Sequence, residues 1–471
     1  MSQAKRPVSE SFTKGKITWR SSWNPTTPTE STPRELVVLA NRLPVHQVDG
    51  QWVTSPGGLV SALKSVLHGR ELCWVGWAGG VDRAPPSFEH ETIRHCPLPL
   101  SRAELESYYE GFANGTLWPL YHDAVRPAEY HRHWWHPYVA VNRRFAEEAA
   151  RNVAPGGTVW VHDYHLQLVP KFLRELRPDV RISFFLHIPF PPEELFAQLP
   201  WRRDILEGML GADVVAFQTR LGAHNFLRLC QRFTSAVGDE RLLKVDERLV
   251  RVRALPISVD SPSLQAIARR PEVRERAMEL KHEFTDRRIV LGVDRLDYTK
   301  GIDIRLRAYE TFLDRNPRGV DETVFVQIAV PSREQVGDYI RMRRRVERMV
   351  GQVNGAHGRP GTTPVHYQYR SLPIDELIAY YLAADIMMVT PLRDGMNLVA
   401  KEYVASRTDD TGVLILSEFA GAAKELIDAV QVNPHDVDGV AAALQLAIDL
   451  DPQEVGERMG ALRQLVNYND V

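Results

Sequence analysis

The 471-residue sequence has few cysteines and no long apolar run. Its three cysteines, Cys73, Cys96 and Cys230, lie far apart and form no Cys-x-x-Cys pair, which argues against a zinc or redox site of the usual spacing. Unpaired thiols are typical of a reducing cytoplasm, and we expect that location. No stretch approaches about 18 uncharged apolar residues. The N-terminal residues also lack a hydrophobic signal core, so we expect no export and no membrane insertion.

Strong net charge is also absent. The formal charge of −2 arises from 58 basic and 60 acidic residues. This balance disfavours binding to nucleic acid or to anionic membranes, so any phosphate recognition must be local. Hydrophobic residues make up 44% of the chain and charged residues 25%, as in soluble globular enzymes. The length predicts two domains of roughly 200 residues each, enough to enclose a cleft.

Short β-branched runs recur along the chain and alternate with segments of helical periodicity. The runs cover residues 35–41, 158–163, 181–188, 212–218, 288–294, 323–330, 384–390 and 412–417. Near-continuous hydrophobic strands separated by helices indicate a parallel α/β architecture. Residues 1–34 are rich in Ser, Thr, Pro and Lys, and we expect a mobile N-terminal extension there. Residues 256–286 separate the two strand series and are the expected domain connection.

Three polar stretches follow predicted strands, where open α/β sheets bind ligands. In the first, Arg42 follows the opening strand, and Gly57 and Gly58 precede a helical pattern at residues 59–67. Glycines and the amides of a helix start can hold a phosphate. Taken alone, this stretch is better explained as a plain turn, and Arg42 is equally an ordinary surface charge.

The second stretch, residues 293–301, carries two cations five residues apart, Arg295 and Lys300. These can converge on a pyrophosphate and stabilise the negative charge that develops as it leaves. The alternative is a solvated loop with an ion pair between Asp297 and Lys300.

The third stretch, residues 393–402, turns from a strand end into a helix that Asn397 or Asp394 can cap. Asp394 is placed to meet sugar hydroxyls in the loop. Glu402 lies about one turn inside the helix, where it can accept hydrogen bonds from ribose hydroxyls.

A cluster of three histidines, His131, His133 and His136, matches no standard metal-binding spacing. We therefore predict no metal site there.

Together these stretches resemble the trehalose-6-phosphate synthase family of retaining glycosyltransferases, from about Glu35 to Val471. The resemblance rests on VHDYHL (161–166), FFLHIPFP (184–191), DRLDYTKG (294–301) and TPLRDGMNLVAKEYVA (390–405). It implies an α/β GT-B architecture, with two facing Rossmann-like domains, parallel sheets and an interdomain cleft. Its implied parts are an N-terminal acceptor domain (35–258), a C-terminal nucleotide-sugar donor domain (259–450), and a C-terminal helical segment (451–471) returning toward the first domain.

The resemblance also implies a role for individual residues. The donor contacts would be Gly57, Gly58, His187, Arg295, Lys300, Leu372, Asp394, Leu398, Val399, Ala400, Lys401 and Glu402, of which Arg295, Lys300, Asp394 and His187 would serve catalysis. The acceptor contacts would be Arg42, Tyr109, Trp118, Asp163 and Arg333. Without the family, His187 is equally an ordinary buried histidine, Tyr109 and Trp118 are core aromatics, and Asp163 is a helix cap.

The implied reaction moves glucose from UDP- or GDP-glucose to glucose 6-phosphate, giving α,α-trehalose 6-phosphate by a front-face route. It implies no cofactor and allows a homo-oligomer. The choice between UDP-, GDP- and ADP-glucose stays open, because the base-recognition loop around Leu372 differs among family members. Two alternatives remain: a transferase with another phosphorylated acceptor, such as glycerol 3-phosphate or an aminocyclitol phosphate, and a catalytically silent sugar-phosphate sensor.

Overall fold

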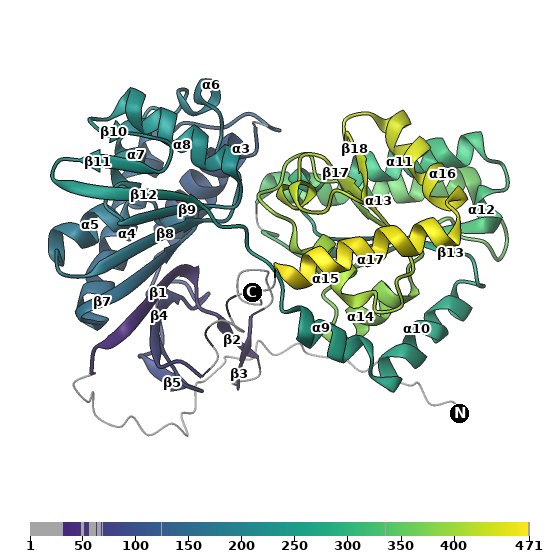
Figure 1. The fold of residues 1–471 in the computed structure, drawn as a ribbon, viewed down its shortest axis with the longest axis horizontal. Coiled ribbons are helices and arrows are strands. Elements are labelled where there is room, and N and C mark those ends of the chain that lie inside the picture. Colours follow the sequence, from purple (N-terminus) through teal and green to yellow (C-terminus); the bar gives the residue numbers. More distant parts are fainter. Residues whose placement is uncertain are drawn as a thin grey trace, which may run out of the picture.

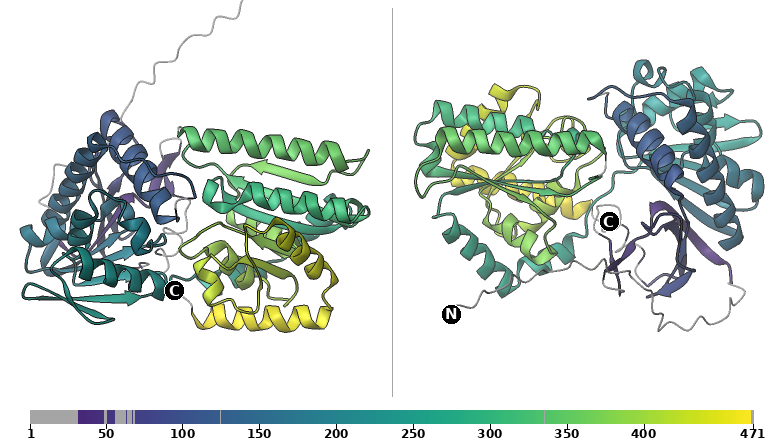
Figure 2. Two further views of the ribbon diagram at one scale, coloured as in Figure 1. Left: turned by 90° about the horizontal axis from the view of Figure 1, so that it is seen from above. Right: turned by 180° about the vertical axis from the view of Figure 1, so that it is seen from behind.

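The computed structural model describes residues 32–48, 51–55, 63, 67, 69–123, 125–334 and 336–469. Within these residues the chain forms two α/β domains that lie side by side, each built on its own sheet (Figures 1 and 2). The expected fold class is therefore confirmed. The extension expected at residues 1–34 lies almost wholly outside the described residues.

The first domain is built on a mixed sheet. In spatial order, its described strands are β10 (Val237–Gly238), β11 (Leu242–Val245), β12 (Arg248–Ala254), β9 (Val214–Phe217), β8 (Arg181–Leu186), β7 (Val153–His162), β1 (Arg34–Arg42), β4 (Leu72–Trp77), β6 (Ile93–Pro97) and β5 (Phe88–His90). Neighbours from β12 to β6 are parallel, whereas β5, β10 and β11 at the edges are antiparallel. These departures from the expected parallel sheet follow from short connections, because a parallel pairing needs a crossover of a dozen or more residues.

The strand β1 shows why the predicted runs are hydrophobic throughout. Val37 and Leu39 face one core cluster, and Val38 and Ala40 face another on the opposite side of the sheet. A strand buried on both faces loses the polar alternation of a half-exposed one. The small hairpin β2 (Val45–Val48) and β3 (Gln51–Thr54) follows β1 directly.

Helices of the first domain cover this sheet and connect its strands. They are α2 (Arg102–Glu104), the π-helix η1 (Leu105–Leu117), α3 (Trp118–Tyr121), α4 (Arg132–Asn152), η2 (Tyr164–Leu166), α5 (Val169–Leu176), α6 (Glu193–Phe196), α7 (Arg202–Met209) and α8 (Arg220–Phe233).

The second domain is a six-stranded parallel sheet with helices on both faces. Its strand order is β15 (Val365–Tyr369), β14 (Thr323–Val330), β13 (Arg288–Arg295), β16 (Ile386–Val389), β17 (Val413–Ser417) and β18 (Val430–Val432). One face carries α11 (Ile302–Arg315), α13 (Gly337–His357) and α16 (Val437–Asp449). The other carries α9 (Ser261–Ala268), α10 (Pro271–Glu283), α14 (Ile374–Ala383), α15 (Leu398–Ser406) and α17 (Pro452–Tyr468). Short helices η3 (Tyr298–Lys300), α12 (Gly319–Glu322) and η4 (Gly421–Lys424) lie in the connections.

The chain passes from the first sheet to the second domain between β12 and α9. The last helix, α17, packs on α15 and α9 and buries Met459, Leu462 and Val466 in the second-domain core. In Figure 1 it runs back across the second domain toward the middle of the molecule.

All eight predicted runs are strands, although β4, whose six residues are all buried, lies outside them. No helix in the described part of the chain is both long enough and apolar enough to span a membrane.

Candidate active site

One unusual helix, η1, positions two of the predicted aromatic residues, Tyr109 and Trp118. The π-helix η1 spans 13 residues, contains Tyr109 and ends at Leu117, directly before Trp118. Gly111 lets the ring of Trp134 pack against it, because a Cβ at Gly111 would lie 2.6 Å from that ring. π-helical turns are rare and occur often at functional sites. Hydrophobic periodicity does not distinguish this geometry from an α-helix, so the sequence could not predict it.

Arg42 and Tyr109 meet at the end of β1. The guanidinium carbon of Arg42 lies 4.5 Å from the centre of the Trp77 ring and 5.7 Å from that of Tyr109. Burial alone would raise the pKa of Tyr109, but Arg333 and Arg42 together lower it. Two cations therefore converge on one phenol, and Arg42 forms no ion pair with any described carboxylate. Such a site is suited to an anion.

Arg333 joins the two domains. Arg333 lies in the loop that follows β14. Its Nη1 donates to Asp297 Oδ2 at 3.1 Å, and its Nη2 donates to the hydroxyl of Tyr164, in the first domain, at 3.0 Å. Its guanidinium carbon also lies 4.0 Å from the centre of the Trp118 ring. The backbone of Arg333 has φ 47°, a left-handed conformation that non-glycine residues seldom adopt. Strain of this kind is concentrated at functional sites.

The loop after β13 does not contain the ion pair between Asp297 and Lys300 that the sequence left open. Lys300 Nζ donates to Asp394 Oδ2 at 2.5 Å, whereas Asp297 accepts from Arg333 and from the amide of Thr299. Burial would raise the pKa of Asp297, but Arg333 and Arg295 lower it to about 2. Asp297 is therefore a charged anchor for Arg333, and no ion pair joins it to Lys300.

Arg295 is exposed at the end of β13, with its guanidinium carbon 5.7 Å from the centre of the Trp118 ring. The indole nitrogen of Trp118 is buried and has no hydrogen-bond partner among the described residues. Arg295 and Arg333 thus both lie close to one indole whose N–H has no partner among the described residues.

The start of α15 is capped as predicted. Asn397 has φ 85°, and its side-chain oxygen accepts from the amide of Ala400 at 3.1 Å. Its amide nitrogen donates to Asp394 Oδ2 at 3.0 Å, the oxygen that also receives Lys300. Asp394 is therefore held by two donors and faces the same loop as Lys300.

His187 lies where the two domains touch. A Cβ at Gly395 would come within 2.1 Å of the carbonyl oxygen of His187, so only glycine fits there. The Nε2 of His187 lies 3.0 Å from Nδ1 of His162, and burial lowers the pKa of His187 to about 3. Asp163 accepts from the amide of His187 at 3.2 Å, and burial raises the pKa of Asp163 to about 6. Around His187 the first domain therefore contributes neutral imidazoles and the single carboxylate of Asp163.

The remaining predicted residues of α15 divide into two groups. Leu398 and Val399 are half-buried at the helix start. The ammonium of Lys401 is directed into the second domain, where it donates to the carbonyl of Ile257 at 3.1 Å and to Glu425 at 3.0 Å. Lys401 therefore cannot offer its side chain to a ligand without breaking those bonds, and only its backbone remains available.

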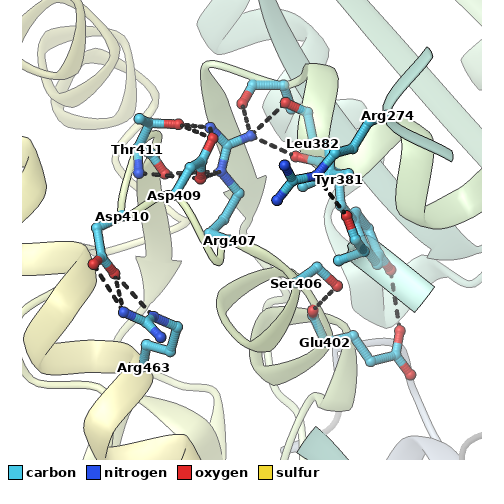
Figure 3. Close-up of polar contacts among 12 residues, drawn as sticks. Arg274, Tyr381, Leu382, Glu402, Ser406, Arg407, Asp409, Asp410, Thr411 and Arg463 are labelled. Atoms are coloured by element: carbon cyan, nitrogen blue, oxygen red, sulfur yellow. Dashed lines mark hydrogen bonds and ion pairs between the residues drawn. The ribbon is translucent and has the colours of Figure 1, made fainter. Parts of the chain in front are cut away.

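Glu402 has one partner for its carboxylate in the described structure. Its Oε2 accepts from the hydroxyl of Tyr381, on α14, at 3.0 Å (Figure 3). Burial raises the pKa of Glu402, and the Tyr381 hydrogen bond opposes that shift.

The chain also matches a known protein family. The profile of glycosyltransferase family 20 matches residues 34–471. The chain belongs to glycosyltransferase family 20.

Relatives in this family share most of the chain. Trehalose-6-phosphate synthase of Mycolicibacterium smegmatis is 52% identical over 458 residues, covering 94% of this chain and 91% of the relative. The crystal structure of an alpha,alpha-trehalose-phosphate synthase (UDP-forming) from Burkholderia xenovorans in complex with glucose-6-phosphate matches with a TM-score of 0.86 at 33% identity, covering 92% of this chain and 96% of that one. A structure from E. coli bound with UDP-2-fluoro glucose gives a TM-score of 0.85 at 34% identity, with coverages of 92% and 96%.

Other predicted residues of this family 20 chain are less defined. Gly57 and Gly58 lie outside the described residues. Leu372 is half-buried in the loop between β15 and α14 and packs against the second-domain core. In the described part of the chain, no group of three or more His, Cys, Asp or Glu side chains is arranged to hold a metal ion.

Four residues with structural roles in the site were missed by sequence reasoning. They are His162, Tyr164, Asp297 and Tyr381. The first three stand inside the motif stretches 161–166 and 294–301, so their position was visible although their partners were not. Tyr381 lies in an ordinary amphipathic helix, and no local signal marks it.

Proposed function

We propose that this family 20 chain is a retaining glycosyltransferase that moves glucose from a nucleoside-diphosphate glucose to glucose 6-phosphate, giving α,α-trehalose 6-phosphate. The activity for which the relatives are named and the ligands bound in the two related structures support this reaction. A match over 94% of the chain leaves no large unmatched segment in which another activity would be carried.

One observation carries the proposal. Two arginines contact the ring of Trp118: Arg295, at the exposed end of β13, and Arg333, in the loop after β14. A pyrophosphate bound by Arg295 and Lys300 and a sugar phosphate bound by Arg42 and Arg333 would then both lie near this one indole. Such an arrangement suits two anionic substrates that must approach each other, since fixed cations hold both phosphates during reaction.

The donor would be held mainly by the second domain. Arg295 and Lys300 bind the pyrophosphate, and Asp394 and His187 bind the transferred glucose. The remaining donor contacts are Gly57, Gly58, Leu372, Leu398, Val399, Ala400, Glu402 and the backbone of Lys401. In the described structure the Lys300 ammonium is paired with Asp394, so a diphosphate would compete for it.

The acceptor would be held where the domains meet. Arg42 and Arg333 bind the phosphate with Tyr109 between them, Trp118 offers its indole N–H, and Asp163 accepts from sugar hydroxyls. The raised pKa of Asp163, to about 6, leaves its carboxylate charged at neutral pH and able to accept.

The chemistry needs no protein nucleophile. The anomeric hydroxyl of the acceptor attacks C1 of the donor glucose while the bond from C1 to the diphosphate oxygen breaks, and the proton passes to that departing oxygen. Asp394 and Asp163 are both engaged in hydrogen bonds that orient them for recognition. Catalysis is then positioning and stabilisation of the leaving charge.

For the base we propose UDP, because the related structure is described as UDP-forming and another holds a UDP sugar. We also propose a cytoplasmic location, supported by three cysteines that are all free and buried. A homo-oligomer stays a prediction, which sedimentation analysis can test.

The deciding experiment measures nucleotide release from UDP-, GDP- and ADP-glucose, each with and without glucose 6-phosphate, with the product identified by NMR. We expect release with UDP-glucose only when glucose 6-phosphate is present, and an α,α-1,1-linked disaccharide phosphate. Turnover with glycerol 3-phosphate or an aminocyclitol phosphate instead would support the other-acceptor alternative. Donor binding without turnover on any acceptor would support a silent sensor.

A further inference from the structure

The carboxylate of Glu402 is held by a neutral hydroxyl. Tyr381, whose side chain is fully buried, donates to Glu402 Oε2 at 3.0 Å. Oε1 accepts no hydrogen bond from the described residues, and no described lysine or arginine forms an ion pair with Glu402. This differs from Asp394, whose charge is partly compensated by Lys300. A hydroxyl partner orients the carboxylate without an opposing charge and leaves its second oxygen for another donor.

The backbone at both ends of this hydrogen bond is fixed (Figure 3). On α14, the carbonyl of Tyr381 accepts from Arg407 Nη1 at 2.9 Å, and the carbonyl of Leu382 accepts from the same atom at 2.6 Å. On α15, the hydroxyl of Ser406 donates to the carbonyl of Glu402 at 2.8 Å. Rotating the Glu402 side chain away therefore breaks the Tyr381 hydrogen bond, with no compensating movement of either helix end.

We propose that Tyr381 is a positioning residue that orients Glu402, so that its free oxygen accepts from a hydroxyl of the donor ribose and the site selects ribose over deoxyribose. This inference rests on the proposed function, because it assumes a nucleoside-diphosphate sugar as donor. A site built to bond a substrate hydroxyl rejects an analogue that lacks it, since the buried polar group then loses its partner. The rejection depends on a carboxylate that cannot turn to water, which is what the Tyr381 hydroxyl provides.

The test compares Tyr381→Phe with Tyr403→Phe. Tyr403 is a matched control, since it is also fully buried, lies 6.1 Å from Tyr381 between ring centres, and has a hydroxyl with no hydrogen-bond partner among the described residues. Steady-state constants are measured with UDP-glucose, 2′-deoxy-UDP-glucose and 3′-deoxy-UDP-glucose, each with saturating glucose 6-phosphate.

We expect Tyr381→Phe to raise KM for UDP-glucose about tenfold with little change in kcat, as for loss of a hydrogen bond to a charged group. We also expect it to reduce, by a similar factor, the preference in kcat/KM for UDP-glucose over at least one deoxy donor. Tyr403→Phe should leave that preference unchanged. A purely structural defect would lower activity with all three donors equally.

Preferences in Tyr381→Phe equal to those of the unmodified chain would overturn the inference. If that variant does not fold, Glu402→Gln replaces it, because it keeps the size of the side chain and removes the charge. Undiminished discrimination in Glu402→Gln would equally refute the inference. Absence of turnover by the unmodified chain with every nucleoside-diphosphate glucose is a different result, because it contradicts the proposed function itself.

Discussion

The two domains supply polar groups to the site in different electrostatic states. In the second domain, four buried or half-buried ion pairs lie in or near the site: Arg305 with Asp294 at 2.7 Å, Arg333 with Asp297 at 3.1 Å, Lys300 with Asp394 at 2.5 Å and Lys401 with Glu425 at 3.0 Å. In the first domain, burial instead drives titratable groups toward neutrality, lowering the pKa values of His162, His165 and His187 and raising that of Asp163. Paired charges suit a diphosphate that is charged throughout, whereas neutral histidines and the single carboxylate of Asp163 suit sugar hydroxyls.

The largest effect should come from breaking a second-domain pair. Arg305 is fully buried and also donates to Gln327 at 3.0 Å and Thr390 at 3.0 Å. Arg305→Met leaves Asp294 buried without its cation, and we expect the free energy of unfolding to fall by about 3–5 kcal/mol. Arg42→Met, in the first domain, loses contacts with the rings of Trp77 and Tyr109 but breaks no ion pair among the described residues, and should lower it by less than about 1 kcal/mol. Urea denaturation followed by circular dichroism measures both, and similar losses would contradict the comparison.

The next largest effect is on the pH dependence of stability, to which Asp163 of the first domain and Asp297 of the second should contribute with opposite signs. The pKa of Asp163 is raised from 3.8 to about 6 in the folded chain, so its stabilising contribution, complete at low pH, is lost as pH rises from about 4 to 6. Asp163→Asn cannot ionise, so its stability relative to the unmodified chain should rise across that window, by up to about 3 kcal/mol.

Asp297 provides the opposite case for the same titration. Its pKa is lowered from 3.8 to about 2, so it stabilises the fold above pH 4, and this contribution is lost as pH falls through 2. Asp297→Asn should therefore be less stable than the unmodified chain at pH 7. Denaturation curves between pH 2 and 7 test both variants, and a pH-independent difference for Asp163→Asn would rule out its assigned pKa.

Among the second-domain cations of the site, Arg295 alone has no ion pair with a described residue. We expect turnover to depend most on Arg295. We expect Arg295→Ala to lower kcat about 100-fold, as for loss of a donor to a developing oxyanion. Arg307→Ala, at an exposed position of α11, is the control and should behave as the unmodified chain. The steady-state rate with saturating UDP-glucose and glucose 6-phosphate measures both, and a kcat for Arg295→Ala within a few-fold of the parent would remove Arg295 from catalysis.

The smallest of these effects is on the KM for glucose 6-phosphate, and it concerns two arginines that lie where the domains meet. Arg42→Ala and Arg333→Lys should each raise KM for glucose 6-phosphate about tenfold, through loss of a charge-assisted hydrogen bond. The KM for UDP-glucose should change little in both variants. Equal changes in the two constants would show that these arginines do not distinguish acceptor from donor.

Much of this site was visible in the sequence because its residues follow buried strands. Asn397 caps α15 as a residue of its type should, and Arg295 and Arg42 end strands that were predicted from hydrophobic runs alone. The prediction for Lys401 was less complete. Its place on the helix was evident, but the direction of its ammonium depends on Ile257 and Glu425, which are distant in the sequence.

The sequence by itself determined the buried strands, the helix caps and the motif stretches, because each depends on neighbouring residues and on burial that hydrophobic runs report directly. The tertiary structure alone decided which charges pair, as Asp297 shows by binding Arg333 in place of Lys300. It also decided the backbone of Asp163, whose φ of 75° and ψ of 169° form a conformation that is otherwise almost confined to glycine. These features arise only when segments far apart in the chain meet, since their energies depend on the partners that folding brings together.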